Sequence, residues 1–277
     1  MRAAGVLLLV TQLVAWTDCG MSEQQLAPHP RLRLTPAGLT SMKAKIATDP
    51  LAATVAEQLA QYGSDLLSKP VVNCSLTGVE NSLLTQARAV LDVTYTLGLL
   101  YRLDQNATWA SRAMQEMLHV AVDPSCTSWN PKHFLDTAEM MHAVAVGYDW
   151  LYHAPADVVA PSDRAKVAEG LATRGLQAVS ANWDGWFFNV TDVNWNEVCN
   201  GGAIAASLVL LDSPEPGHAA LAAAVLKNAT HNIRNSEMLQ YAPDGAWSEG
   251  PTYLLRPICK RRTRGLEAAR QHYGNRY

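Results

Sequence analysis

The sequence predicts an all-α protein built from consecutive antiparallel helical hairpins. Apolar residues recur at helical spacing over long stretches, and nowhere is there a convincing set of alternating strands. The clearest stripe lies between residues 133 and 152, where Phe134, Ala138, Met141, Ala145 and Tyr148 follow one another at alternating steps of four and three. These positions share one face of a helix, so we expect them to face the core.

Start and stop signals divide the rest of the chain into further helices. Thr35-Pro36 is typical of a helix start, because Thr can cap the first turn and Pro fits the first helical position. Ser162 is expected to cap another helix, which follows Pro155 and Pro161. The expected helices cover residues 36–48, 50–67, 82–103, 108–120, 133–152, 162–180, 196–211 and 216–238.

The N-terminus has the form of a secretory signal peptide. Met1-Arg2 is followed by an apolar stretch from Ala3 to Ala15 and then by polar residues up to Gly20. The stretch is too short to span a membrane as a mature helix. We therefore expect residues 1–20 to be removed and the protein to be secreted without a membrane anchor. The net charge of −3 over 277 residues gives no case for nucleic acid or an anionic membrane as a partner.

Four N-glycosylation sequons agree with secretion. In each of them an Asn is followed two positions later by Ser or Thr. One sequon is a weak signal, whereas four in a chain with a predicted signal peptide indicate a glycosylated surface. The predicted acceptors are Asn73, Asn106, Asn189 and Asn228.

The four cysteines that follow the predicted signal peptide, Cys74, Cys126, Cys199 and Cys259, allow one or two bridges, and we predict one particular bridge and one free thiol among them. Cys74 precedes the helix expected at 82–103, and Cys126 follows the helix expected at 108–120. These ends lie side by side in an antiparallel hairpin, so we predict a disulfide between Cys74 and Cys126. Cys199, inside an expected helix, is predicted to be a buried free thiol. The sequence contains no CxxC pair, so a zinc ribbon is not expected.

Two further stretches carry residue types that indicate chemistry. Asn194-Trp195-Asn196 stands before an apolar helical run, and Gly201-Gly202 lies shortly inside that run. An N-cap explains one Asn, but not two with a Trp between them. Gly within a helix costs about 1 kcal/mol relative to Ala, so the pair indicates close packing or binding against the backbone. The second stretch joins a Pro-Asp-Gly turn to a helix start, a place where sites are often carried. Its polar and aromatic residues are Asp244, Trp247, Glu249 and Tyr253.

Three motifs together resemble the heparinase II/III-like polysaccharide lyases. The segments that carry the resemblance are His133-Phe134-Leu135-Asp136-Thr137-Ala138-Glu139 with Gly147-Tyr148-Asp149-Trp150-Leu151-Tyr152, then Asn194-Trp195-Asn196-Glu197-Val198-Cys199-Asn200-Gly201-Gly202, and Pro243-Asp244-Gly245 with Glu249-Gly250-Pro251-Thr252-Tyr253. The resemblance runs from about His29 to Tyr253. It implies an (α/α) toroid of antiparallel helical hairpins over residues 28–256, with a substrate groove across one end. Residues 257–277 form a basic tail that does not look like the family.

The resemblance also implies cleavage of uronic-acid polysaccharides by β-elimination. The proton next to a uronate carboxylate is hardly acidic until the carboxylate charge is offset, so an amide or a protonated group must bind that carboxylate. A tyrosine near C5 can then act as base, and as acid toward the leaving oxygen. Matched residue by residue, Asn194 takes the neutralising role, Asn196 is a second candidate for it, and Tyr253 takes the acid/base role. The expected partner is an acidic polysaccharide, and no cofactor is expected.

The groove side of the implied toroid carries further expected substrate-binding residues, namely His133, Glu139, Trp195, Trp247 and Glu249. The chain departs from the family in two places. Related lyases have a His where Trp195 stands, and they usually continue into a β-sandwich domain that supplies another catalytic His. We therefore expect Asn194 and Tyr253 to hold one uronate between them, with turnover that is slow or absent.

Other functions stay open from the residues alone. A uronyl C5-epimerase would use the same proton abstraction, and a non-catalytic remnant would only bind carbohydrate. A glycoside hydrolase would need two carboxylates, for which Glu139, Asp244 and Glu249 are available. The aromatic loop between Trp183 and Trp195 either stacks on sugar rings or fills the toroid. The sequence does not define the oligomeric state.

A metal site is not expected. His133, Asp136, Glu139 and His142 recur every three residues and therefore drift around half of their helix. A single ion could use two of them at most. A groove-lining role for His133 and Glu139 is favoured over a metal centre.

Overall fold

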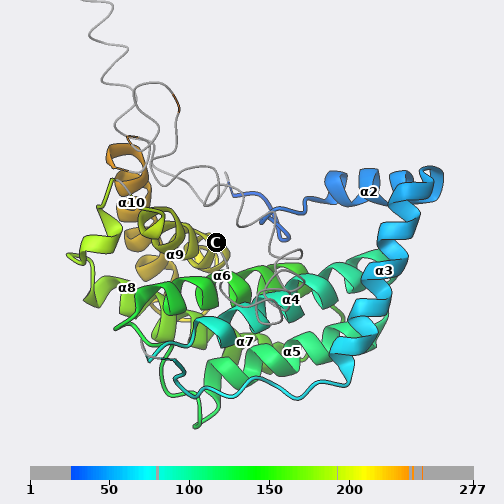
Figure 1. Ribbon diagram of the computed structural model, residues 1–277, viewed down its shortest axis with the longest axis horizontal. Helices are drawn as coiled ribbons and strands as arrows, with labels where there is room; N and C mark the ends of the chain where they lie inside the picture. Colours follow the sequence, from blue (N-terminus) through cyan, green and yellow to red (C-terminus); the bar gives the residue numbers. More distant parts are fainter. Residues whose placement is uncertain (1–25, 79–80, 192, 237–238, 240–244, 246–277) are drawn as a thin grey trace, which may run out of the picture.

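In the computed structural model, which describes residues 26–78, 81–191, 193–236, 239 and 245, the regular elements are helices (Figure 1). An isolated β-bridge joins Thr77 to Ser82. The predicted all-α fold is therefore confirmed for this part of the chain. None of the helices described is both long and apolar enough to cross a membrane. The elements are α2 (Pro36–Thr48), α3 (Pro50–Leu67), α4 (Leu84–Asp104), α5 (Ala107–Val122), α6 (Phe134–Leu151), α7 (Pro161–Gly170), the π-helix η2 (Leu171–Leu176), α8 (Gln177–Ala181), the 3₁₀-helix η3 (Trp186–Phe188), α9 (Trp195–Leu210) and α10 (His218–Asn235).

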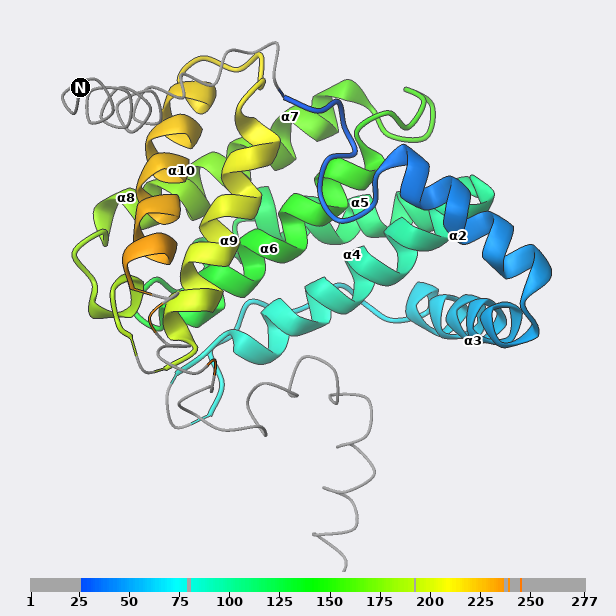
Figure 2. The same ribbon diagram turned by 90° about the horizontal axis from the view of Figure 1, so that it is seen from above.

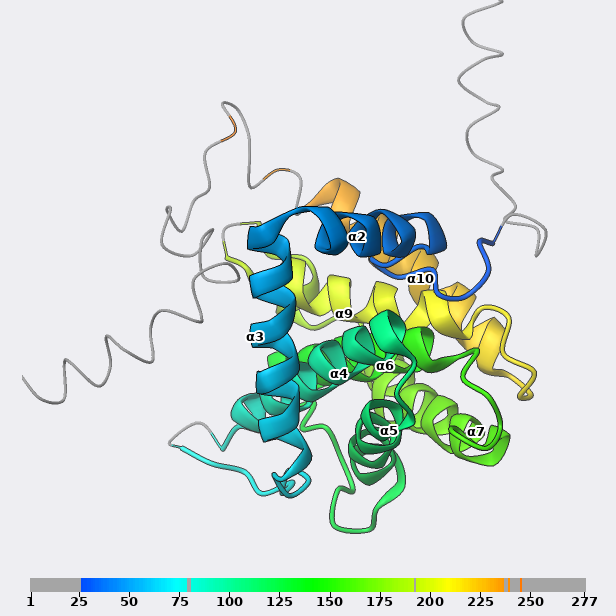
Figure 3. The ribbon, with the colours of Figure 1, turned by 90° about the vertical axis from the view of Figure 1, so that its right-hand side faces the viewer.

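Helix α6 is the centre of the structure. It packs against α4 and against α9, and α5, α7 and η2 also contact it (Figures 1 and 3). Of its 18 residues, 15 are buried. Phe134, Met141, Ala145 and Tyr148 are among them, so the predicted core stripe is confirmed.

Three residues of α6 remain partly exposed, and they define the open face of this helix. Leu135, Glu139 and His142 are separated by steps of four and three, so they lie in one row along the helix. This row is the only part of α6 at which a ligand could meet side chains of the helix itself.

Four of the helices form a row. Figure 2 shows α4, α6, α9 and α10 side by side, and each neighbouring pair in that row is in contact. Only Gln105 and Asn106 join α4 to α5, and these two helices pack against each other. Gln105 has a φ of 61° and ends α4, which lets the chain reverse within this short connection.

Close packing of α9 on α6 explains one of the two neighbouring glycines. A Cβ on Gly202 would collide with the backbone of Ala138 in α6, whereas Gly201 is exposed and has open space around its Cα. The predicted close approach is therefore confirmed at Gly202. Gly201 instead leaves a patch of helix backbone uncovered.

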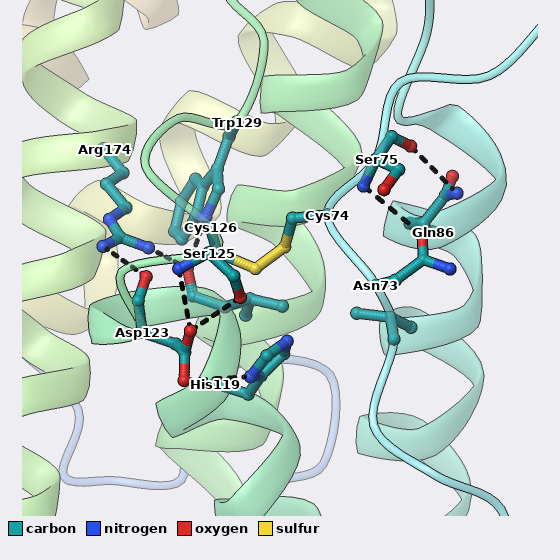
Figure 4. The surroundings of a disulfide bond; sticks show 12 residues. Asn73, Cys74, Ser75, Gln86, His119, Asp123, Ser125, Cys126, Trp129 and Arg174 are labelled. Atoms are coloured by element: carbon teal, nitrogen blue, oxygen red, sulfur yellow. Dashed lines mark hydrogen bonds and ion pairs between the residues drawn. A yellow bond between two sulfur atoms is a disulfide. The ribbon is translucent and has the colours of Figure 1, made fainter.

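The predicted disulfide between Cys74 and Cys126 is present, with Cα atoms 5.1 Å apart (Figure 4). It ties the segment before α4 to the loop after α5. Trp129 donates from its indole N–H to the Val120 carbonyl in the same region (2.8 Å). Cys199 is buried and unbridged, as predicted, and burial raises the pKa of its thiol.

Asp149, near the C-terminal end of α6, binds the segment of residues 29–32. This carboxylate accepts hydrogen bonds from the backbone N–H groups of Arg31 (2.9 and 3.0 Å) and Leu32 (2.7 Å), and it lies 2.5 Å from Nδ1 of His29. The Trp150 indole donates to the Leu32 carbonyl (2.9 Å). Segment 29–32 thus reaches the core through polar contacts at the end of α6.

Several helix boundaries differ from the prediction. Ser162 is not a cap, because α7 begins at Pro161 and its cap position, Ala160, makes no side-chain bond. The helix expected at 162–180 changes its winding at η2, next to Gly170, whose Cα lies against the backbone of Ala121. Helix α9 begins one residue earlier than predicted and α10 two residues later. Thr35 caps α2 as predicted, accepting from the Gly38 N–H (3.1 Å).

Candidate functional site

Two of the predicted site segments meet at one end of α6 and α9. His133 precedes the first residue of α6, and Trp195 is the first residue of α9. Their rings pack edge to face with centroids 5.1 Å apart. The helix N-termini of α6 and α9 therefore lie at the same end of the molecule. The other predicted site residues, Asp244, Trp247, Glu249 and Tyr253, lie outside the described residues.

A buried carboxylate in the first turn of α6 holds the His133 ring. Oδ1 of Asp136 lies 2.8 Å from Nδ1 of His133, and the Asp136 side chain is wholly buried while that of His133 is 16% exposed. Asp136 also accepts from the Ser82 hydroxyl (2.8 Å), the Leu83 backbone N–H and the Asn130 amide (2.8 Å). Nδ1 is the ring nitrogen that faces Asp136, so Nε2 points away from this carboxylate.

The aromatic loop packs both inward and outward from this contact. Phe187 stacks on Phe134 with ring centroids 4.7 Å apart, and Phe188 is completely buried. Trp186 lies 5.0 Å from Trp195 between ring centroids and is 59% exposed. The two alternatives for this loop thus apply to different residues: the phenylalanines fill the interior, and Trp186 offers an exposed ring.

Asn196 belongs to the interior of the structure. It is fully buried, and its amide donates to the Val190 carbonyl (2.7 Å) and the Ser236 hydroxyl (2.6 Å). Its side-chain oxygen accepts from the amide of Asn200 (2.8 Å), which also donates to the Phe188 carbonyl (3.1 Å). Direct contact between Asn196 and a substrate would require this network to open. In the described structure Asn196 supports the aromatic loop.

Asn194 occupies the cap position of α9 without capping it. Its φ and ψ are −65° and −5°, and its side chain makes no bond to the first turn of the helix. The residue is partly buried and directly precedes Trp195. The capping explanation therefore does not account for this Asn.

Glu139 on the open face is paired with Arg88 of α4. The guanidinium makes three hydrogen bonds of 2.8–3.0 Å to the two carboxylate oxygens. The Glu139 side chain is 15% exposed and that of Arg88 is 40% exposed. Both oxygens of Glu139 are thereby engaged by Arg88.

His142, one turn further along the open face, has a neutral partner. Its Nε2 lies 2.8 Å from the Tyr95 hydroxyl, and the Arg33 guanidinium stands 5.9 Å from the centre of the Tyr95 ring. Burial lowers the pKa of His142 to about 4, and the positive charge of Arg33 acts in the same direction. Burial also raises the pKa of Tyr95.

Potential metal ligands occur together at the disulfide. The ligand atoms of Cys74, His119 and Cys126 lie within 4.8 Å of one another, but both sulfurs are bonded to each other (Figure 4). On α6, each potential ligand has another partner: His133 pairs with Asp136, and Glu139 pairs with Arg88.

Two surface hollows flank α5 and contain none of the predicted site residues. They are lined by Leu67, Ala107, Thr108, Ser111, Arg112 and Gln115, and by Val71, Gln115, Leu118, His119, Val122 and Asp123. The chemistry-bearing residues lie instead at the start of α6 and α9. We therefore place the candidate site there.

Scans of the chain against models of protein families and against curated proteins found no match. The candidate site is accordingly defined by its own geometry. It combines a His whose Nδ1 faces a buried carboxylate with the exposed ring of Trp186, whose flat apolar face suits a sugar ring.

Two contributors to the site were not assigned from the sequence. Asp136 could have been suspected, because His and Asp three positions apart on a helix face each other. Arg88 carries no local signal, since its partner Glu139 lies 51 positions away.

Proposed function

We propose that this protein is a secreted polysaccharide lyase-like protein that acts on uronic-acid polysaccharides by β-elimination. The observation that carries the proposal is the meeting of His133 with the Asn194-Trp195 motif at one end of α6 and α9, beside the exposed ring of Trp186. This arrangement joins hydrogen-bond donors for a carboxylate to an aromatic surface for the sugar.

The proposed elimination consists of three bond changes. A base removes the C5 proton, the electron pair forms a C4=C5 double bond, and the C4–O bond breaks as the leaving oxygen takes a proton. Binding of the uronate carboxylate by Asn194 makes the C5 proton more acidic. Tyr253, outside the described residues, is the proposed base and acid.

The N-termini of two adjacent helices, α6 and α9, lie at the candidate site, and each carries a partial positive charge. Such ends favour a carboxylate near the first turn, and each helix already has one there, Asp136 in α6 and Glu197 in α9. The proposal of an acidic substrate therefore depends on the direct hydrogen bond from Asn194.

The finer architecture is part of the proposal. The row formed by α4, α6 and α9, with α5, α7 and η2 packed behind it, is the arrangement expected for an arc of an (α/α) toroid. Secretion and glycosylation belong here as well. All four sequon asparagines, Asn73, Asn106, Asn189 and Asn228, are exposed, as a glycan requires.

An elimination assay tests the proposal. We expect purified protein incubated with glycosaminoglycans and alginates to produce ultraviolet absorbance from the conjugated double bond. Tyr253→Phe should abolish the signal, and Lys166→Ala, at an exposed ion pair distant in sequence from the site, should retain it. Turnover that survives Tyr253→Phe would show that another residue is the base.

The same samples separate the alternative functions. New reducing ends without ultraviolet absorbance indicate a hydrolase. Deuterium uptake at C5 from heavy water without cleavage indicates an epimerase. Binding without either change indicates a non-catalytic carbohydrate-binding protein.

A further inference from the structure

Two covalent modifications fall on adjacent residues. Asn73 is the acceptor of the sequon Asn73-Cys74-Ser75, and Cys74 forms the disulfide with Cys126. Asn73 is exposed, so the folded protein has room for a glycan at this residue. Glycosylation belongs to the proposed secreted state of the protein, so the consequence of this adjacency rests on that proposal and not on the elimination reaction.

We propose that Asn73 is glycosylated only before the disulfide closes, so that the bridge determines how much of the protein carries this glycan. A glycosyltransferase must bind the Asn amide together with the hydroxyl-bearing residue two positions later, which requires a chain that is free on both sides. The middle residue of this sequon is Cys74. Closing the bridge therefore removes the freedom of the sequon at its centre.

The two reactions draw on different reagents of the secretory pathway. In the glycosyl transfer, Nδ2 of Asn73 attacks the anomeric carbon of a lipid-linked oligosaccharide diphosphate. The C–N bond forms, the C–O bond to the diphosphate breaks, the diphosphate leaves with the electron pair, and Nδ2 loses a proton. In the competing reaction, the thiols of Cys74 and Cys126 pass two electrons and two protons to a protein disulfide by thiol–disulfide exchange.

The folded structure holds the sequon on both sides of Cys74. Before it, the Val72 backbone N–H donates to the carboxylate of Glu116 (2.9 Å), which is fully buried. After it, the Gln86 amide donates to the Ser75 carbonyl (3.2 Å), as Figure 4 shows. The bridge thus fixes the middle of a segment that is also bound at each end, and the folded sequon cannot enter an active site.

The order of synthesis gives Asn73 a limited time without the bridge. Cys126 follows Cys74 by 52 residues, which at about 5–20 residues per second takes on the order of 3–10 s. Disulfide formation then takes seconds or longer. Glycan transfer and bridge closure therefore compete, and chains in which the bridge closes first keep an unmodified Asn73.

A glycan that is already attached still permits the bridge. Asn73 accepts the Ser75 backbone N–H through Oδ1 (3.3 Å), whereas a glycan is linked through Nδ2. Asn106 has the same local arrangement, because its Oδ1 accepts the Thr108 backbone N–H (3.0 Å). The sequon of Asn106 lies within the loop that the bridge closes, but it contains no cysteine. Asn106 is therefore the matched control.

The test measures the glycosylated fraction at each sequon in protein secreted by cultured eukaryotic cells. Enzymatic removal of the glycans in heavy-oxygen water marks every occupied Asn for mass spectrometry. Wild type is compared with Cys126→Ala, which keeps the sequon of Asn73 intact, and with Cys199→Ala, which removes a thiol but no bridge. We expect incomplete occupancy of Asn73 in wild type, a higher fraction in Cys126→Ala and the wild-type fraction in Cys199→Ala. The fraction at Asn106 should be the same in all three proteins.

A membrane-permeant thiol reductant, added during synthesis, gives a second readout. It should raise the occupancy of Asn73 in wild type and have no further effect in Cys126→Ala, because both treatments remove the same bridge. Measured on cell extracts, this comparison also serves if Cys126→Ala is retained in the cell. Equal occupancy of Asn73 in wild type and Cys126→Ala would overturn the proposal, as would a parallel rise at Asn106 or glycosylated wild-type chains without the bridge.

The proposed function and this inference can fail separately. Bridge-dependent occupancy of Asn73 in a protein without elimination activity supports the inference and removes the lyase activity. Glycans at Asn106, Asn189 and Asn228, together with an occupancy of Asn73 that ignores the bridge, keep the glycosylated state and remove the inference. A secreted protein without a glycan at any sequon removes both the glycosylation and the inference.

Discussion

Helix α6 carries a fully buried carboxylate near each end, and the protein uses the two in different ways. Asp136 and Asp149 each accept backbone N–H groups from a segment that arrives from elsewhere in the chain, and each contacts Nδ1 of a histidine. At Asp149 the histidine is His29, which is buried and stacks on the ring of Tyr152. At Asp136 the histidine is His133, beside the aromatic loop.

The difference lies in what covers the ring. The His29 side chain is 2% exposed and that of His133 is 16% exposed, although their carboxylate partners are equally buried. A buried carboxylate paired with a histidine therefore stabilises the fold where an aromatic ring covers the pair. Where the ring reaches the surface, the same pair is a candidate site.

The two ends also differ in covalent support, and removing it should produce the largest loss of stability. The disulfide between Cys74 and Cys126 closes a loop with a sequence separation of 52 near the Asp136 end. Chain entropy predicts that Cys74→Ser with Cys126→Ser lowers the free energy of unfolding by about 4 kcal/mol. Denaturant unfolding measures this, and hydrogen exchange should show faster opening at Leu83 than at Leu32. Cys199→Ala, which breaks no bridge, should cost much less. Equal stability with and without the bridge would contradict the prediction.

The Asp149 end lacks a disulfide in the described structure, so it depends on its carboxylate. Asp149→Ala leaves His29 and the N–H groups of Arg31 and Leu32 without their acceptor, which should cost about 3 kcal/mol. The exposed pair of Asp163 with Lys166 supplies the control, since Asp163→Ala should cost less than about 1 kcal/mol. If the amides of Arg31 and Leu32 stay protected from hydrogen exchange in Asp149→Ala, other contacts hold the segment.

The sequence predicted what depends on local periodicity. The core face of α6 followed from apolar spacing, and the disulfide followed from the hairpin that joins α4 to α5. The spacing of Asp136 from His133 indicated only that local pair; the distant donors of the two buried carboxylates could not be assigned, because Asp136 binds Leu83 from 53 positions away and Asp149 contacts His29 from 120 positions away. The local sequence of a helix does not distinguish a buried carboxylate that accepts hydrogen bonds from distant residues from a carboxylate that faces water.

The candidate site was predictable to a similar extent. Motifs pointed to His133 and Trp195 separately, but their contact depends on the packing of α9 against α6, which Gly202 permits. Asn196 was expected at the substrate, whereas its position one residue into α9 turns it toward Val190 and Ser236. A motif identifies residue types, and helix rotation decides which of them reach the surface.

A third histidine, which lies within α6 itself, sharpens the comparison because its hydrogen-bond partner is neutral. His142 pairs with the Tyr95 hydroxyl near Arg33, and burial lowers its pKa from 6.5 to about 4. The unfolded chain then binds one more proton between these values. The contribution to stability is complete above pH 6.5 and falls as the pH drops toward 4, by at most about 1.4 kcal/mol per pH unit and by about 3 kcal/mol in all. Urea unfolding of wild type and His142→Gln over this range measures the slope, and a slope unchanged in the variant would assign it to other groups.

The smallest effect on stability is expected at Trp186. Comparing Trp186 with a buried neighbour tests whether exposed residues of the aromatic loop bind a ligand while buried ones stabilise the fold, as we infer for the two carboxylates. Trp186 is 59% exposed, whereas Phe188, two residues later, is fully buried. Trp186→Ala should change the free energy of unfolding by no more than about 0.5 kcal/mol, and Phe188→Ala should cost about 3–5 kcal/mol.

If Trp186 stacks on a sugar, its removal should lower the affinity for the carboxylate and the carboxyl-reduced forms of an oligosaccharide alike, because stacking uses the ring face and not the charge. A loss at Trp186→Ala that is confined to the carboxylate form would mean that the indole acts by supporting Trp195 and the adjacent Asn194, and the exposed ring would then be part of the donor site.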